Sequence, residues 1–107
     1  MSNAWIFLVT AGLFEIGWPV GLKMAQTPGK TGPGILIAVG CMALSGWLLW
    51  LAQRQIPMGT AYAVWTGIGA VGTFITGVLL YGDPAGLGRT LGVVLIIGGV
   101  AVLKLAH

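Results

Sequence analysis

The sequence predicts an all-α membrane protein with four transmembrane helices, and its composition and hydropathy pattern both support this fold class. Of the 107 residues, 57% are hydrophobic and only 7% are charged, whereas soluble domains contain about 25% charged residues. A helix that spans a bilayer needs about 20 predominantly apolar residues. Four stretches meet this requirement, at residues 4–24, 34–52, 58–81 and 87–106.

The segments between these stretches are short and rich in helix breakers. They read "QTPGKTGPG" (26–34), "QRQIP" (53–57) and "YGDPAG" (81–86), where Asp83 followed by Pro84 favours a turn. Such brief connections make successive helices antiparallel neighbours. We therefore expect one four-helix domain over residues 1–107. The first stretch contains Glu15 and no basic segment precedes it, so we expect a retained helix rather than a cleaved signal.

The basic residues are few and scattered singly. This pattern provides no basic stripe for nucleic acid. If both termini lie on one side of the membrane, that side holds Arg54 and Lys104, and the other holds Lys23, Lys30 and Arg89. A committed orientation needs a clear excess of Lys and Arg on the cytoplasmic side. The near balance leaves two interpretations: one weakly biased orientation, or insertion in both orientations with antiparallel self-pairing.

The sequence contains no catalytic constellation. It has no Ser/His/Asp set, no cluster of metal ligands and no phosphate-binding loop, so we expect neither an enzyme nor an ATP-driven pump, and no metal or cofactor. The single cysteine, Cys41, cannot form an intrachain disulfide and is expected to pack as a small residue.

Glu15 is the main candidate for function. A carboxylate in the middle of a transmembrane helix costs a few kcal/mol, and such residues usually mark ion pathways or proton relays. No basic residue lies within a helical turn of it. Glu15 is therefore predicted to hold a proton or to exchange it for a cation. The alternative is a permanently protonated side chain bonded to a neighbouring helix.

The residues one helical turn away favour the functional interpretation. Ala11 and Gly12 precede Glu15 and leave space beside its carboxyl group, whereas Trp18 follows it and supplies an aromatic face and an N–H donor. Pro19 cannot donate a backbone hydrogen bond to the carbonyl of residue 15. That carbonyl is either an additional acceptor beside the carboxylate or the mark of a packing kink.

The third stretch carries a polar and aromatic face. Its members are Tyr62, Trp65, Thr66, Gly69, Thr73 and Thr76. Tyr62 is suited to hydrogen-bond a carboxylate, and Trp65 to stack on a flat cation. For Thr73 and Thr76 we expect hydrogen bonds back to their own helix rather than contact with cargo. Ser45 is the only hydroxyl in the second stretch, and by itself it is most simply a packing residue.

Glycines suggest a bend and an association surface. Gly67 and Gly69 allow the third helix to bend or to pack closely. In the fourth stretch Gly88 and Gly92 form a small-xxx-small pair, and Gly99 follows on the same face. Such faces associate helices in membranes, so the fourth helix is the predicted dimer contact.

These motifs together resemble the small multidrug resistance family of four-helix, proton-coupled exporters, from end to end. The resemblance is carried by "GLFEIGW" and "GLK" in the first stretch, by "IPMGTAYAVWTGIGAVG" entering the third, and by the glycines of the fourth. Trp18 and "VWTGIGA" are similar to the guanidinium exporter subtype rather than to the quaternary ammonium subtype.

The resemblance implies an antiparallel, dual-topology homodimer in the bacterial inner membrane, in contact with lipid. The implied cargo is guanidinium or a small guanidinylated cation, exported against protons and bound between two copies of Glu15. By position, Ser45 and Trp18 support the Glu15 carboxylates, and Tyr62 and Trp65 line the pocket. Gly67 and Gly69 fall at the bend of the third helix, and the fourth helix is the dimer contact.

One position departs from the family pattern. Members of this subtype usually have an alanine-like residue where Pro19 stands, and a kink there widens the pocket and leaves strict guanidinium selectivity open. One alternative function is a broad exporter of quaternary ammonium compounds, which aromatic residues near Glu15 also suit. The other is a non-transporting membrane partner subunit, which needs a clear Lys and Arg bias towards one orientation.

Overall fold

The computed structural model describes residues 3–106, and within them it contains four α-helices. These are α1 (Asn3–Ala25), α2 (Thr31–Ala52), α3 (Met58–Tyr81) and α4 (Leu87–Ala106). All four are long and apolar enough to cross a membrane, which confirms the predicted fold class. Helix α2 begins at Thr31 rather than at residue 34, because Pro33 falls in its first turn, where a missing N–H breaks no helical hydrogen bond.

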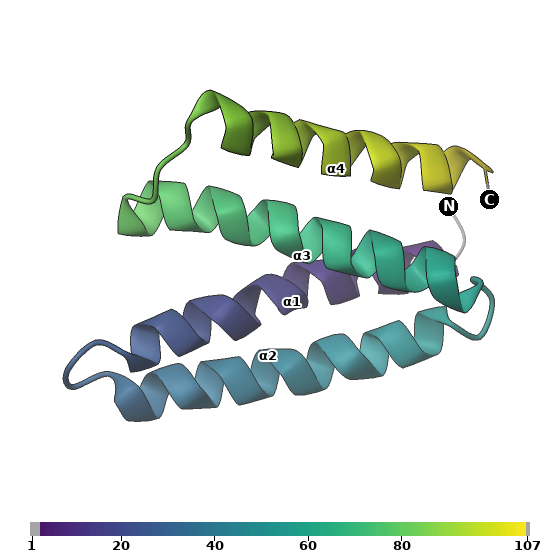
Figure 1. Cartoon of the computed structure of the whole chain (residues 1–107). Helices are drawn as coiled ribbons and strands as arrows, with labels where there is room; N and C mark the ends of the chain where they lie inside the picture. The colour runs from purple at the N-terminus through teal and green to yellow at the C-terminus, as the bar shows by residue number, and fades with distance from the viewer. Residues whose placement is uncertain (1–2, 107) are drawn as a thin grey trace.

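The helices alternate in direction, so α1 and α3 run parallel to each other (Figure 1). One end of the molecule holds the start of α1 and the end of α4, and we call it the terminal end. The opposite end holds the α1–α2 and α3–α4 connections, and we call it the loop end. Arg54 and Lys104 lie at the terminal end, and Lys23, Lys30 and Arg89 lie at the loop end. The basic residues are thus divided between the two ends as the sequence predicts.

Small residues allow α1 and α2 to approach closely. A Cβ atom on Gly21 would lie 2.6 Å from the backbone nitrogen of Ala38, and one on Gly34 would collide with the backbone of Ala25. Neither backbone can move aside as a flexible side chain can. Cys41 packs against Gly17 in the same interface, in the small-residue role expected for it. Close backbone packing of this kind is the usual basis of helix association in lipid.

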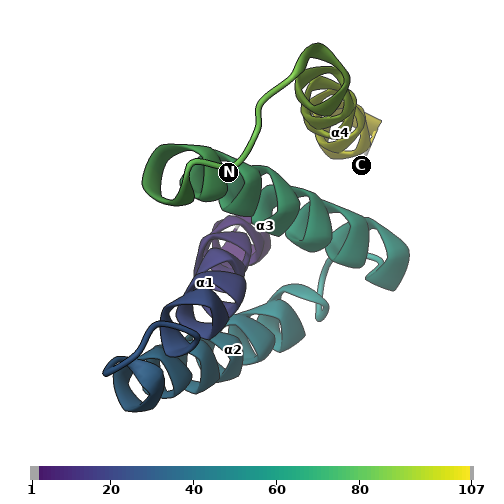
Figure 2. The ribbon, with the colours of Figure 1, turned by 60° about the vertical axis from the view of Figure 1, so that its left-hand side comes forward.

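A buried apolar cluster closes the protomer at its terminal end. It consists of Ala4, Trp5, Leu8, Ala52, Ile56, Ala61 and Val64. These residues come from the start of α1, the end of α2 with the following turn, and the start of α3. The Lys104 ammonium of α4 lies 5.3 Å from the centre of the Trp5 ring. Helix α1 lies between α2 and α3 (Figure 2), and the cluster joins the three helices at one end only.

Helix α4 is the least integrated element. None of its residues is buried in the part of the chain that the structure describes, and it packs chiefly against α3. The contact forms where Ile96 and Val100 approach Gly67, whose missing side chain leaves room for them. Figure 2 shows α4 standing away from α1 and α2. Most of the surface of α4 is therefore free to meet lipid or another protein chain.

Candidate functional site

Glu15 lies in the middle of α1 and packs against α3 at Gly69. A Cβ atom on Gly69 would lie 2.6 Å from Cγ of Glu15, so any larger residue there would displace the acidic side chain. The Glu15 side chain is half-buried. Gly69 was predicted as part of a bend. In the structure it also leaves the space on α3 that the Glu15 side chain occupies.

A cavity of about 370 Å³ opens beside the Glu15 carboxylate. Helix α1 contributes only Glu15, and the rest of the lining comes from α3: Tyr62, Trp65, Thr66, Gly69, Ala70 and Thr73. The rings of Tyr62 and Trp65 lie with their centres 5.5 Å apart. The cavity thus combines one acid with aromatic faces and hydroxyl groups, and no basic residue lines it. The sequence predicted this combination for Glu15, Tyr62 and Trp65.

One oxygen of the carboxylate has no partner. Oε2 of Glu15 is buried and makes no hydrogen bond within the described residues 3–106. A buried polar atom without a partner is costly, and a buried charge is more costly still. The oxygen therefore needs something that the rest of the described chain does not provide. A bound proton or a cation with N–H donors satisfies this need.

Ser45 connects three helices beside the site. Nε1–H of Trp65 donates a hydrogen bond to Oγ of Ser45 at 2.8 Å, and the Ser45 hydroxyl donates to the carbonyl oxygen of Ala11 at 2.7 Å. The Ser45 side chain is fully buried and also lies within hydrogen-bonding reach of the Glu15 carboxylate. Trp65 is thereby fixed in the cavity wall from behind. The sequence could not predict that the Ala11 carbonyl is the acceptor, because any backbone carbonyl can accept such a bond.

Two predicted site residues lie elsewhere in this structure. Trp18 is half-buried on α1 and does not line the cavity beside Glu15. Gly12 is buried, and a Cβ atom on it would lie 2.7 Å from the Cβ of Ile68. The space that Gly12 leaves is therefore occupied by a side chain of α3. Its position serves the contact between α1 and α3.

The remaining predicted residues have clear positions. Helix α3 is continuous through Gly67 and Gly69, so the bend there stays a prediction. The Thr76 hydroxyl donates to the carbonyl of Gly72 at 2.8 Å, as expected for a membrane threonine. The Thr73 hydroxyl makes no such bond among the described residues and lines the cavity instead, contrary to expectation.

Gly92 and Gly99 of α4 face open space. No atom of the described chain lies within 4 Å of a Cβ atom built on either glycine. Neither residue is needed for packing inside the protomer. Their predicted place in a dimer contact is compatible with this position and is taken up below.

Four helices long and apolar enough to cross a membrane, with a buried carboxylate oxygen that has no partner among the described residues, define a small multi-pass membrane protein. Comparison with known families identifies the family. The family described as Small Multidrug Resistance protein matches residues 3–96, and the chain belongs to it. This is a family of transporters, and the protein is not an enzyme.

Individual relatives are similar over nearly their whole length. A guanidinium exporter of Yersinia pseudotuberculosis is 52% identical over 103 residues, which cover 96% of this chain and 98% of the relative. Guanidinium exporters of Salmonella typhimurium and Klebsiella oxytoca are each 48% identical over 103 residues, covering 96% of this chain and 97% of the relative.

The hydrogen bond between Trp65 and Ser45 predicts a measurable coupling. In a double-mutant cycle with Ser45→Ala and Trp65→Phe, the two substitutions should be non-additive by about 0.5–1.5 kcal/mol in the free energy of unfolding, the usual net value of one such bond. The measurement is denaturant unfolding in detergent micelles. Ser45→Ala combined with Trp50→Phe is the matched control, because Trp50 lies half a turn before the end of α2, where its ring packs against the Arg54 guanidinium. Additive effects in the Ser45 and Trp65 cycle would contradict the assignment.

Proposed function

We propose that this protein exports guanidinium or small guanidinylated cations across the bacterial inner membrane in exchange for protons. The observation that carries the proposal is the unpartnered, buried oxygen of Glu15 in a cavity without basic residues. The names of the similar relatives support guanidinium as cargo.

The chemistry of the cavity suits a flat cation with N–H donors. A guanidinium group presents its donors as a planar fork that pairs with a carboxylate through two hydrogen bonds. It also stacks on aromatic rings, and Trp65 and Tyr62 supply such rings beside Glu15. A quaternary ammonium ion can use the rings but has no donor for the free oxygen of Glu15. The unpartnered oxygen therefore favours guanidinium over that alternative.

Exchange follows from competition for a single group. A deprotonated Glu15 binds the cation, and a protonated Glu15 is neutral and releases it. Because both cannot occupy the carboxylate at once, an inward flow of protons is coupled to an outward flow of cargo. The cost of an unpaired charge in the membrane ensures that one or the other is always bound.

Ser45 is proposed to adjust to the state of Glu15. Its hydroxyl has one proton and two acceptors within reach, the Ala11 carbonyl and the Glu15 carboxylate. In this structure the hydroxyl donates to Ala11, and we assign this arrangement to the protonated form of Glu15. When Glu15 is charged, rotation towards the carboxylate gives a charge-assisted bond, which is the stronger of the two.

We further propose that the working unit is an antiparallel homodimer. The cavity wall comes from α1 and α3 alone, so a second copy can close the site and add a second Glu15. Helix α4 offers Gly92 and Gly99 in open space for close contact with a partner helix. The near balance of Lys and Arg between the two ends suits insertion in both orientations. Two protomers that exchange conformations around the shared site would then give alternating access.

Glu15→Gln should retain the fold but lose cargo binding and transport, because its amide cannot exchange a proton for a cation. Uptake of labelled cation into proteoliposomes with an imposed pH gradient should be clear with guanidinium for the wild type, absent for Glu15→Gln, and much smaller with tetramethylammonium. At low pH the wild-type Kd for guanidinium should rise about tenfold per pH unit for each proton displaced. Asp83→Asn, which removes the other acid of the chain, should keep wild-type affinity. Wild-type uptake in Glu15→Gln would refute the scheme, and equal uptake of both cations would favour the broad exporter.

Gly99→Leu should weaken the dimer and leave the protomer folded, because its side chain meets nothing within the chain but obstructs a partner helix. The expected result is a larger monomer fraction in detergent, measured by crosslinking or by single-molecule photobleaching, with unchanged helix content. Gly98→Leu is the control, since Gly98 also faces open space but lies on another face of α4. Equal dimer fractions in both variants would argue against this face as the contact.

A further inference from the structure

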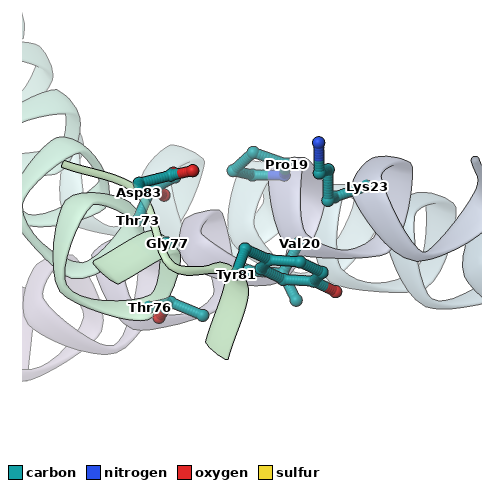
Figure 3. A pocket seen from close by; sticks show the side chains of 8 residues that line it. All are labelled: Pro19, Val20, Lys23, Thr73, Thr76, Gly77, Tyr81 and Asp83. Carbon is teal, nitrogen blue, oxygen red and sulfur yellow. The ribbon is translucent and has the colours of Figure 1, made fainter. Parts of the chain in front are cut away.

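A second cavity, of about 190 Å³, lies towards the loop end of the protomer, and Figure 3 shows the side chains that line it. Its lining comes from the last turns of α1 and α3 and from the turn that follows α3: Pro19, Val20, Lys23, Thr73, Thr76, Gly77, Tyr81 and Asp83. Thr73 lines this cavity and also the cavity at Glu15. The two cavities are therefore neighbours along α3. The second cavity lies between the Glu15 cavity and the C-terminal end of α3.

The backbone holds Asp83 over this cavity. Gly82 ends α3 in the left-handed conformation, with φ of 67°, and turns the chain back on itself. The Asp83 N–H then donates to the carbonyl of Gly77 at 3.1 Å. The Asp83 carboxylate lies directly over Gly77, where a Cβ atom would collide with its Oδ2. The turn at Gly82, the backbone hydrogen bond to Gly77 and the missing side chain of Gly77 thus place the Asp83 carboxylate at this cavity.

Among the groups at this cavity, the Asp83 carboxylate and the C-terminal turns of α1 and α3 attract cations, whereas Lys30, Arg89 and the N-termini of α2 and α4 lie at the same end but outside the lining. Because α1 and α3 are parallel, both of their C-terminal ends lie here, and helix C-termini carry partial negative charge. The Asp83 carboxylate adds a full negative charge. The chain also provides a cation of its own, since the Lys23 ammonium lies 5.9 Å from the centre of the Tyr81 ring. The Tyr81 ring, which lines the cavity with Asp83, thus already has the Lys23 ammonium over it.

We propose that this cavity is an outer binding site for small organic cations with N–H donors, and that Lys23 is a tethered competitor that cargo displaces. Asp83 and the Tyr81 ring bind the arriving cation. The free hydroxyl of Thr73 lines both cavities and contacts the cation as it moves from this site to Glu15. The inference rests on the proposed transport of cations by Glu15. It adds a second site, which that proposal does not require.

Such a site changes the rate of cargo capture but not the affinity of Glu15. A charge at the mouth of a groove raises the local concentration of its counter-ion, and salt screens this effect over about 8–10 Å. The kcat/KM for guanidinium should therefore depend on Asp83 at low ionic strength and lose that dependence at high ionic strength. The equilibrium Kd of the inner site should remain the same.

The test measures initial rates of guanidinium uptake into proteoliposomes as a function of ionic strength. Asp83→Asn should lower kcat/KM at least about threefold at low salt and approach the wild type at high salt. Gly77→Ala keeps every charge but displaces the Asp83 carboxylate, so it should lower kcat/KM in the same way. Gly86→Ala is its control, because nothing lies within 4 Å of a Cβ atom on Gly86.

The competitor is tested by removing its charge. Lys23→Met should raise kcat/KM at low salt several-fold, since it frees the Tyr81 ring and the cavity for cargo. Lys30→Met removes the same charge from the same end of the molecule but from outside the cavity, and it should have a clearly smaller effect. Equal effects of the two lysine variants would refute the competitor.

Each failure has its own signature. If the wild type transports guanidinium and Asp83→Asn matches it at every ionic strength, the outer site does not exist. If Asp83→Asn loses equilibrium binding as completely as Glu15→Gln does, Asp83 supports the fold or the inner site, and the proposal is wrong. If the wild type transports no guanidinium, the proposed function fails and the outer site fails with it.

Discussion

The buried carboxylate oxygen of Glu15 that has no partner is the constraint on which the rest of this structure depends. In a membrane such an atom needs a proton, a cation or a donor, and the described residues give Oε2 none of these. Gly69 gives the side chain a place to lie against α3. Ser45 fixes Trp65 beside it and remains within reach of the acid. The site therefore has a hydrogen-bonded aromatic wall and one carboxylate oxygen without a partner.

The packing of the helices leaves a cavity beside the Glu15 side chain. The buried apolar cluster closes α1, α2 and α3 at the terminal end, and close backbone contact of Gly21 and Gly34 binds α1 to α2. No comparable cluster joins α1 and α3 near Glu15 in the described part of the chain, and the cavities lie there and at the loop end. Helix α4 contributes no buried residue to the described part of the chain, and only Val100 and Leu103 of α4 pack against the apolar cluster. The protomer is therefore packed around an apolar cluster at its terminal end and has cavities between α1 and α3.

Hydropathy was enough to predict the helices, because a membrane leaves the backbone few alternatives to helix. The same argument selected Glu15 as the candidate functional residue, since an acid in an apolar run is costly without a function. Helical periodicity placed Tyr62 and Trp65 together in the cavity wall. These predictions concern properties of single helices, which the local sequence contains.

The positions that sequence reasoning misjudged depend on neighbours from other helices. Gly12 leaves space in the sequence, but Ile68 of α3 fills that space in the structure. Thr73 was expected to bond to its own helix, but the groove leaves its hydroxyl free. Trp18 is one turn from Glu15 along α1 but lies outside the cavity lining. Whether a gap is filled, or a donor used, is decided by tertiary packing, which residue spacing does not encode.

The central claim is that one carboxylate is shared between a proton and the cargo, and proton release on binding tests it most directly. Guanidinium is added to purified wild-type protein in weakly buffered detergent solution, and the released protons are measured with a pH indicator alongside the bound cation. Proton release in proportion to guanidinium bound is expected from the wild type, and none from Glu15→Gln. Tight binding of guanidinium by the wild type without proton release, at a pH where Glu15 begins protonated, would contradict it.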